Sequence, residues 1–90
     1  MQQQIPTIHL VVGTPDEVNR WHIYAELDES IWKWTPVIRD TTRKGAKVKT
    51  GEAKLSARNP HRCVGRAAAW LSDQYHRGND PEVEGGEPDS

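Results

Sequence analysis

The sequence predicts an α+β domain: an antiparallel sheet of three to four strands with one C-terminal helix (60–77) packed on one face. Two observations lead to this prediction. Before residue 58, apolar and polar residues alternate in several stretches, as they do in strands with one buried face. After that point the apolar spacing becomes that of an amphipathic helix. With 90 residues the chain has room for a single domain, which we assign to residues 1–78.

The first two strands are expected at residues 6–12 and 20–27, where apolar residues take every second position. An alternative concerns residues 15–29, because Thr14 and Glu17 have the spacing of a capping box that opens a helix. We prefer the strand, since the alternation is strict and the letters WHIY favour β structure. One helical turn after Thr14 remains expected.

Two further strands are expected at residues 31–39 and 46–57. In the first of these, Trp32 and Trp34 share one face with other apolar residues, so we expect both indoles in the core. The alternative is an exposed platform on which nucleic-acid bases stack. In the second strand, Gly51 indicates a bulge or a bend.

The helix has the clearest signals. Asn59 is a favourable N-cap, and Pro60 suits the first helical position because its missing N–H would have no partner there. Gly78 can close the other end. One apolar stripe follows the helical period and consists of Val64, Ala67, Ala68, Leu71 and Tyr75.

Charge is segregated along the chain although the total is only −1. Residues 39–66 contain nine basic and two acidic residues, a net charge of +7. Residues 80–90 contain five acidic residues and no basic one. Because residues 79–90 lack any apolar periodicity, we expect them to form a disordered acidic tail.

The basic residues provide the leading candidate site. Cationic side chains at a turn, a strand face and a helix N-terminus are the groups with which proteins contact phosphates. The alternative is an ordinary solvated surface that the acidic segments compensate. The candidate nucleic-acid-binding residues are Arg43, Lys44, Lys47, Lys49, Arg58, Arg62 and Arg66.

A family resemblance rests on the stretches WHIYAELDESIWKWTPVI and TGEAKLSARNPHRCVGRAAAWL. These resemble the small bacterial YegP-like domains, which show an IY strand, a WxW strand and a helix rich in small residues. The similarity covers residues 21–72, and the long loop at 40–46 departs from the family pattern. The resemblance implies the fold and almost nothing about chemistry.

Catalytic and metal-binding patterns are missing from the sequence. It has no phosphate-binding loop, dinucleotide fingerprint, nucleophile elbow or carboxylate pair, so we expect no enzyme activity and no cofactor. His61 and Cys63 are close in sequence, but a zinc site normally has paired cysteines, so we expect no metal. Cys63 follows Arg62 near a helix N-terminus, a position that would lower the pKa of its thiol. No catalytic partner accompanies it.

Two classes of function remain. The first is a small non-enzymatic accessory or regulatory protein of the bacterial or phage type that binds DNA or RNA through a basic hairpin and the helix N-terminus. The second is a protein-interaction module, such as a phage-type modulator of a host protein. A cytoplasmic location without membrane contact is expected from the single cysteine and the lack of long apolar runs. A homodimer through an edge strand stays open.

Overall fold

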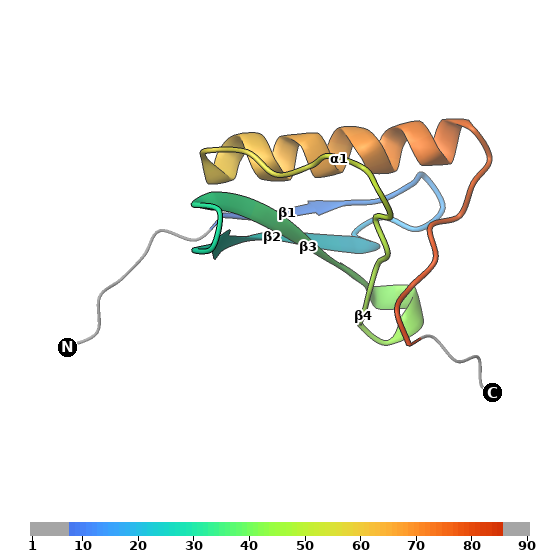
Figure 1. Cartoon of the computed structure of the whole chain (residues 1–90). Coiled ribbons are helices and arrows are strands. Elements are labelled where there is room, and N and C mark those ends of the chain that lie inside the picture. The colour runs from blue at the N-terminus through green and yellow to red at the C-terminus, as the bar shows by residue number, and fades with distance from the viewer. Residues whose placement is uncertain (1–7, 86–90) are drawn as a thin grey trace.

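The computed structural model describes residues 8–85. It contains a four-stranded antiparallel sheet in the order β1-β2-β3-β4, and one helix lies across one face of that sheet (Figure 1). The predicted α+β fold is confirmed. The elements are β1 (His9–Val12), β2 (Trp21–Asp28), β3 (Lys33–Asp40), the 3-10 helix η1 (Thr41–Arg43), β4 (Ala46–Lys47) and α1 (Pro60–His76).

The central pair of strands, β2 and β3, sets the register of the core. Trp21 lies opposite Asp40, and Ile23 lies opposite Ile38. Alternate residues of a strand point to opposite faces, so one face of this pair is apolar and covered by α1. Residues 21–28 are therefore a strand, and the helical alternative for 15–29 is wrong. The capping signal is used locally, since the Thr14 hydroxyl accepts a hydrogen bond from the Glu17 N–H at 3.0 Å and fixes a single turn.

Helix α1 forms as its sequence signals predict. The Asn59 side chain accepts a hydrogen bond from the backbone N–H of Arg62 at 2.8 Å and so caps the first turn. Gly78 follows the helix with φ of 77°, a left-handed conformation that glycine adopts without strain. The face turned to the sheet buries Cys63, Val64, Ala67 and Leu71.

Trp32 contradicts the expectation that both Trp32 and Trp34 build the core. It lies in the β2–β3 turn with φ of 50° and is 71% exposed. Trp34, on β3, is half-buried and packs against the core. The prediction failed for Trp32 because strand alternation begins only at Lys33, and the backbone of the preceding turn directs the indole into solvent.

The strand expected at 46–57 exists only as the two residues of β4. Beyond β4 the chain touches β3 at separate points, where the Val48 N–H donates to Ile38 O at 2.8 Å and Ala57 pairs with Trp34. Gly51, with φ of 60°, turns the chain between these points. Leu55 and Ala57 alternate with polar residues because both side chains are buried in the core. The period of two therefore arises here without a continuous strand.

The acidic C-terminal segment also differs from the prediction. Residues 79–85 are packed and not disordered, and Val83 forms an antiparallel bridge with Val48. Val83 is 9% exposed and belongs to the core cluster. Burial of this apolar side chain favours packing of the acidic segment beside Val48. The ordered domain thus extends past residue 78, and residues 86–90 of the predicted tail lie outside the described residues.

Candidate functional site

The seven predicted basic residues fall into two groups that the fold keeps apart. One group lies around η1 and β4, and the other lies at the start of α1, which is the opposite end of the molecule (Figure 1). A single continuous phosphate track through all seven is therefore not formed. The hairpin group is Arg43, Lys44, Lys47 and Lys49, and the helix-start group is Arg58, Arg62 and Arg66.

Part of the hairpin group is neutralised by the chain's own acidic segment. The Arg43 Nη2 lies 2.6 Å from Asp80 Oδ2, and the Lys49 Nζ lies 4.0 Å from Glu82 Oε1. Lys44 and Lys47 are exposed and form no ion pair with any residue between 8 and 85. These two lysines therefore provide most of the uncompensated positive charge of the hairpin group.

The side chains of the helix-start group are exposed, but one of them forms a hydrogen bond to the neighbouring loop. Arg66 Nη1 donates to Ser56 O at 2.6 Å, which holds the incoming loop against the helix. The side chain of Asn59 already accepts the N–H of Arg62 in the first turn. The side chains of Arg58 and Arg62 form no hydrogen bond or ion pair with residues 8–85, yet this cluster lies on the side of the sheet that α1 covers.

Aromatic and cationic side chains gather on the other side of the sheet, which α1 does not cover. We call this side the open face and define it by His9, His22, Tyr24, Arg39 and Lys47. The register places His9 opposite Tyr24, and places Arg39 between His22 and Lys47 on the neighbouring strands. Opposite residues of paired strands share a face. The open face therefore contains residues from all four strands.

Three rings of the open face stack into a continuous row. The centroid of the His9 ring lies 4.5 Å from that of Tyr24, with only 7° between their planes, and 4.9 Å from that of His22. His9 Nε2 and His22 Nδ1 are 2.8 Å apart, so one nitrogen donates to the other. Arg39 is exposed next to this row, and its Nη1 reaches Gly45 O at 3.3 Å.

Of the residues that make up or adjoin this face, the sequence pattern selects only Lys44, Lys47 and Lys49. The apolar positions of each strand are assigned to the core, and the positions between them receive no functional role. A usable signal is present, since the alternate residues of 21–28 and 33–40 are polar or aromatic apart from Val37 and include His22, Tyr24 and Arg39. What brings His9 beside Tyr24 is strand pairing.

A buried ion pair joins the start of β2, the end of β3 and the acidic segment of residues 79–85. Arg20 donates through Nε and Nη2 to Asp40, which is fully buried, and Nη2 also reaches Asp80 at 2.9 Å. The hydrogen bond with Asp40 raises the pKa of Arg20 above its ordinary value. Burial acts to raise the pKa of Asp40, but hydrogen bonds from Arg20 and Thr42 outweigh it, so this pKa lies below its ordinary value.

Cys63 does not have the reactive character that its position suggested. It is fully buried on the face of α1 that is turned to the sheet, and burial raises the pKa of its thiol to about 11, although Arg66 acts in the opposite direction. The expectation of a lowered pKa was wrong because desolvation outweighs the nearby charge. Between residues 8 and 85, no group of three or more His, Cys, Asp or Glu residues is arranged to hold a metal ion.

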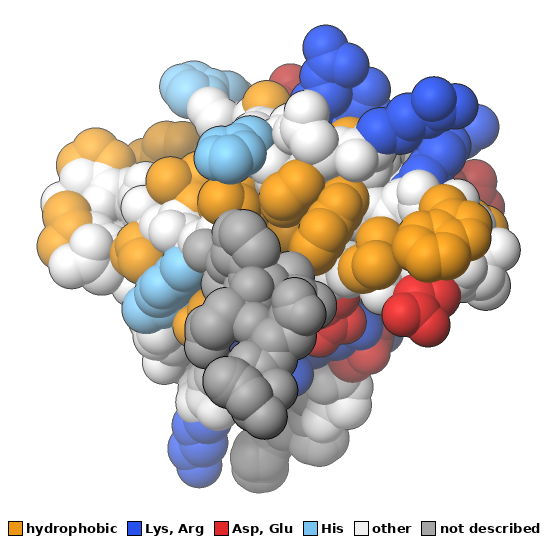
Figure 2. Space-filling model, turned by 90° about the vertical axis from the view of Figure 1, so that its left-hand side faces the viewer, with side chains coloured by type: hydrophobic (Ala, Val, Ile, Leu, Met, Phe, Trp, Pro, Cys, Tyr) orange, Lys and Arg blue, Asp and Glu red, His pale blue; other side chains and the backbone are white. Residues whose placement is uncertain are grey.

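A second exposed feature lies at the tip of the β2–β3 hairpin. Ile31 and Trp32 are exposed there, and Leu27 is partly exposed nearby. Figure 2 views this end of the molecule and shows hydrophobic side chains gathered on the surface with Lys and Arg side chains beside them. A contiguous group of exposed apolar side chains often marks an interaction site, whereas single exposed apolar residues do not.

No protein-family model, curated protein or solved structure matches this chain. The resemblance to YegP-like domains therefore stays a prediction. Within residues 8–85, no helix has the length and apolar character needed to cross a membrane.

Proposed function

We propose that this chain is a small non-enzymatic accessory protein, of the bacterial or phage type, that binds single-stranded DNA or RNA on the open face of its sheet. The observation that supports this most is the row of stacked rings from His9, His22 and Tyr24 beside Arg39 and Lys47. Single-stranded nucleic acid is bound by such combinations, because rings stack with bases and cations contact phosphates.

The remaining basic residues have graded roles in this proposal. Lys44 adjoins the open face at its β4 edge and extends the path for the phosphate backbone. Lys49 lies at the same edge but is partly neutralised, since its Nζ is 4.0 Å from Glu82 Oε1. Arg43 contributes less, because Asp80 already holds its guanidinium at 2.6 Å. The helix-start group lies on the opposite side and would contact nucleic acid only outside this path.

The test is binding of a short labelled oligothymidine at several salt concentrations. Each lost phosphate contact flattens the slope of log K against log salt by about 0.7 for a single strand. Lys47→Ala and Arg39→Ala should each do so and should weaken binding at every base sequence, because phosphates carry no sequence information. Tyr24→Leu should weaken binding without changing the slope, since it removes stacking and no charge.

The matched control is Arg62→Ala, an exposed cation on the other side of the molecule. It should leave affinity and slope unchanged. If Arg62→Ala weakens binding as much as Lys47→Ala does, the open face is not the site. If the protein does not bind the oligonucleotide at about 50 mM salt, where electrostatic attraction is strong, the proposal of nucleic-acid binding fails.

A protein-interaction module is the second candidate, and the exposed hairpin tip supports it. Trp32 is held in a left-handed conformation that is costly for a large side chain, and such strain is concentrated at functional positions. A partner protein should then lose affinity on Trp32→Ser but not on Lys47→Ala. If a co-purified partner instead loses affinity on Lys47→Ala but not on Trp32→Ser, the hairpin tip is not its binding site and this candidate is refuted.

A further inference from the structure

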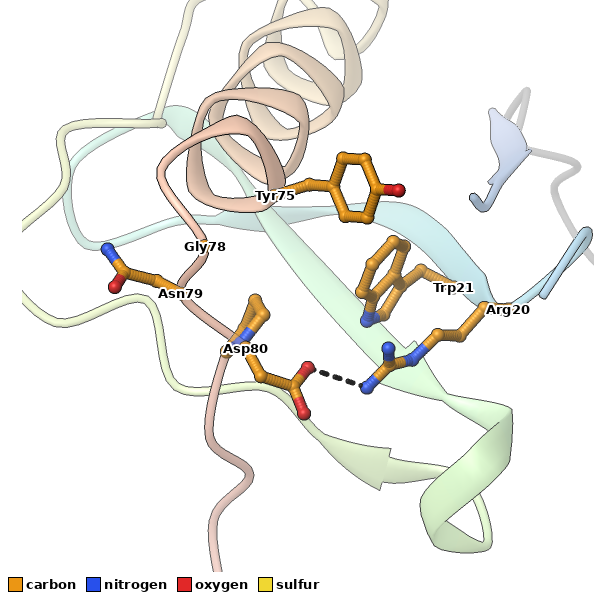
Figure 3. A pocket seen from close by; sticks show the side chains of 7 residues that line it. Arg20, Trp21, Tyr75, Gly78, Asn79 and Asp80 are labelled. Atoms are coloured by element: carbon orange, nitrogen blue, oxygen red, sulfur yellow. Dashed lines mark hydrogen bonds and ion pairs between the residues drawn. The ribbon is translucent and has the colours of Figure 1, made fainter. Parts of the chain in front are cut away.

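A pocket of about 250 Å³ lies where the end of α1 and the acidic segment meet the start of β2. Figure 3 shows its walls: Trp21 and Arg20 come from β2 and the residue before it, Tyr75 comes from α1, and Asp80 comes from the segment that follows the helix. Gly78, Asn79 and Pro81 complete the lining. Residues far apart in the sequence therefore converge on one small space.

The pocket contains an unused hydrogen-bond donor. Trp21 is only 3% exposed, and its Nε1 has no hydrogen-bond partner among residues 8–85. In Figure 3 this nitrogen lies on the edge of the indole that is turned toward Asp80, while the Arg20 guanidinium lies over the ring, 4.5 Å from its centroid. Buried donors are almost always paired, because an unpaired one loses its hydrogen bonds to water and gains none in return. An unpaired N–H inside a pocket is what a ligand's acceptor atom would satisfy.

The charged groups of the pocket limit what that ligand can be. The Arg20 guanidinium is already engaged, since its nitrogens donate to Glu17, Asp40 and Asp80 at 2.9–3.3 Å. The carboxylate of Asp80 forms part of the wall and would repel an anion. A cation would lie near Arg20 and would leave the indole N–H unpaired. A neutral acceptor, such as an amide or ketone oxygen, satisfies the donor without either penalty.

We propose that this pocket binds a compact neutral carbonyl compound or amide side chain. Its oxygen accepts the N–H of Trp21, and its apolar part lies against Tyr75 and Pro81. The volume is slightly below the roughly 300–1,000 Å³ of usual ligand pockets, so the occupant is a small molecule or a single side chain of a partner. The ligand enters between Tyr75 and Asp80, which are 48% and 56% exposed. This site is independent of the open face.

The first experiment is a titration of the isotope-labelled protein with three probes, followed through the four indole N–H signals in NMR spectra. Benzamide should shift the Trp21 signal downfield and saturably, because its oxygen accepts that proton. Benzoate has the same shape with a negative charge, and should bind at least about tenfold more weakly because of Asp80. Toluene has no acceptor and should not move the N–H downfield. Equal shifts from benzamide and benzoate, or no saturable shift of Trp21 at millimolar benzamide, would overturn the proposal.

The variant to compare is Tyr75→Ala, since this exposed helix residue can be truncated without opening the core. It should raise the dissociation constant for benzamide by several-fold. Its matched control is Trp32→Ala, which removes an exposed aromatic ring from the opposite end of the molecule and should leave benzamide binding unchanged. A Tyr75→Ala variant that binds benzamide as well as the wild type would also refute this site.

Discussion

Val83 offers a direct test of how the C-terminal segment is held. Its side chain is 9% exposed within the core cluster, and the backbone on both sides of it is bonded to the chain at β4. The Lys49 N–H donates to Glu82 O, and the Glu84 N–H donates to Lys47 O, both at 2.7 Å. Val83→Ala removes two methyl groups from this core and leaves these backbone bonds possible.

The expected cost follows from the buried carbon atoms. Burial of each methyl group contributes about 0.8 kcal/mol, and the cavity left behind adds to the loss, which gives a destabilisation of about 2 kcal/mol. For a domain of this size, 1 kcal/mol corresponds to roughly 4–8 °C in melting temperature. Val83→Ala should therefore lower the melting temperature by about 8–16 °C.

The assay is thermal unfolding followed by circular dichroism, repeated with urea to obtain the free energy of unfolding. The matched control is Glu84→Ala, at the exposed neighbouring position, which should stay within about 0.5 kcal/mol of the wild type. Deleting residues 79–90 should destabilise at least as much as Val83→Ala, because it also removes Asp80 from Arg20. If Val83→Ala and the deletion both melt like the wild type, the segment does not pack, and the expectation of a disordered tail from residue 79 holds after all.

Three further predictions follow from the described contacts. Because the pKa of Asp40 in the folded protein lies below its ordinary value of 3.8, the ion pair with Arg20 stabilises the fold above that pH. That contribution is lost as the pH falls through the lowered pKa, and Asp40→Asn should flatten the fall in urea stability. Cys63, with a pKa near 11, should resist iodoacetamide at about pH 8 until the protein is unfolded, and rapid alkylation of the native protein would contradict its burial. Trp34→Ala should cost roughly 2–3 kcal/mol in urea unfolding and Trp32→Ala less than about 0.5, and equal losses would contradict the exposure of Trp32.

The local elements could be predicted from the sequence because their signals lie within a few residues of one another. The cap at Asn59, the proline after it and the glycine at 78 bound a helix that forms as expected. The alternation at 20–27 likewise outweighed a capping signal at Thr14, because strand pairing buries a whole apolar face while the cap stabilises one turn.

The candidate site was less predictable. The exposed basic residues were recognisable from composition and spacing, and Lys47 does lie on the open face beside Arg39. Their partners were not recognisable. Whether Arg43 is free to bind an anion depends on Asp80, and whether His9 joins a row of rings depends on its pairing with β2.

The sequence by itself determined the helix, the three main strands and the apolar face between them, since each depends on a period of a few residues. Tertiary structure decided what had no such period: the irregular path of 48–57, the exposure of Trp32, and the docking of 79–85. Asp80 meets Arg20 across 60 positions of the chain. Such a contact exists only because the fold has already placed both partners at one end of the two central strands, where a buried guanidinium requires carboxylates around it.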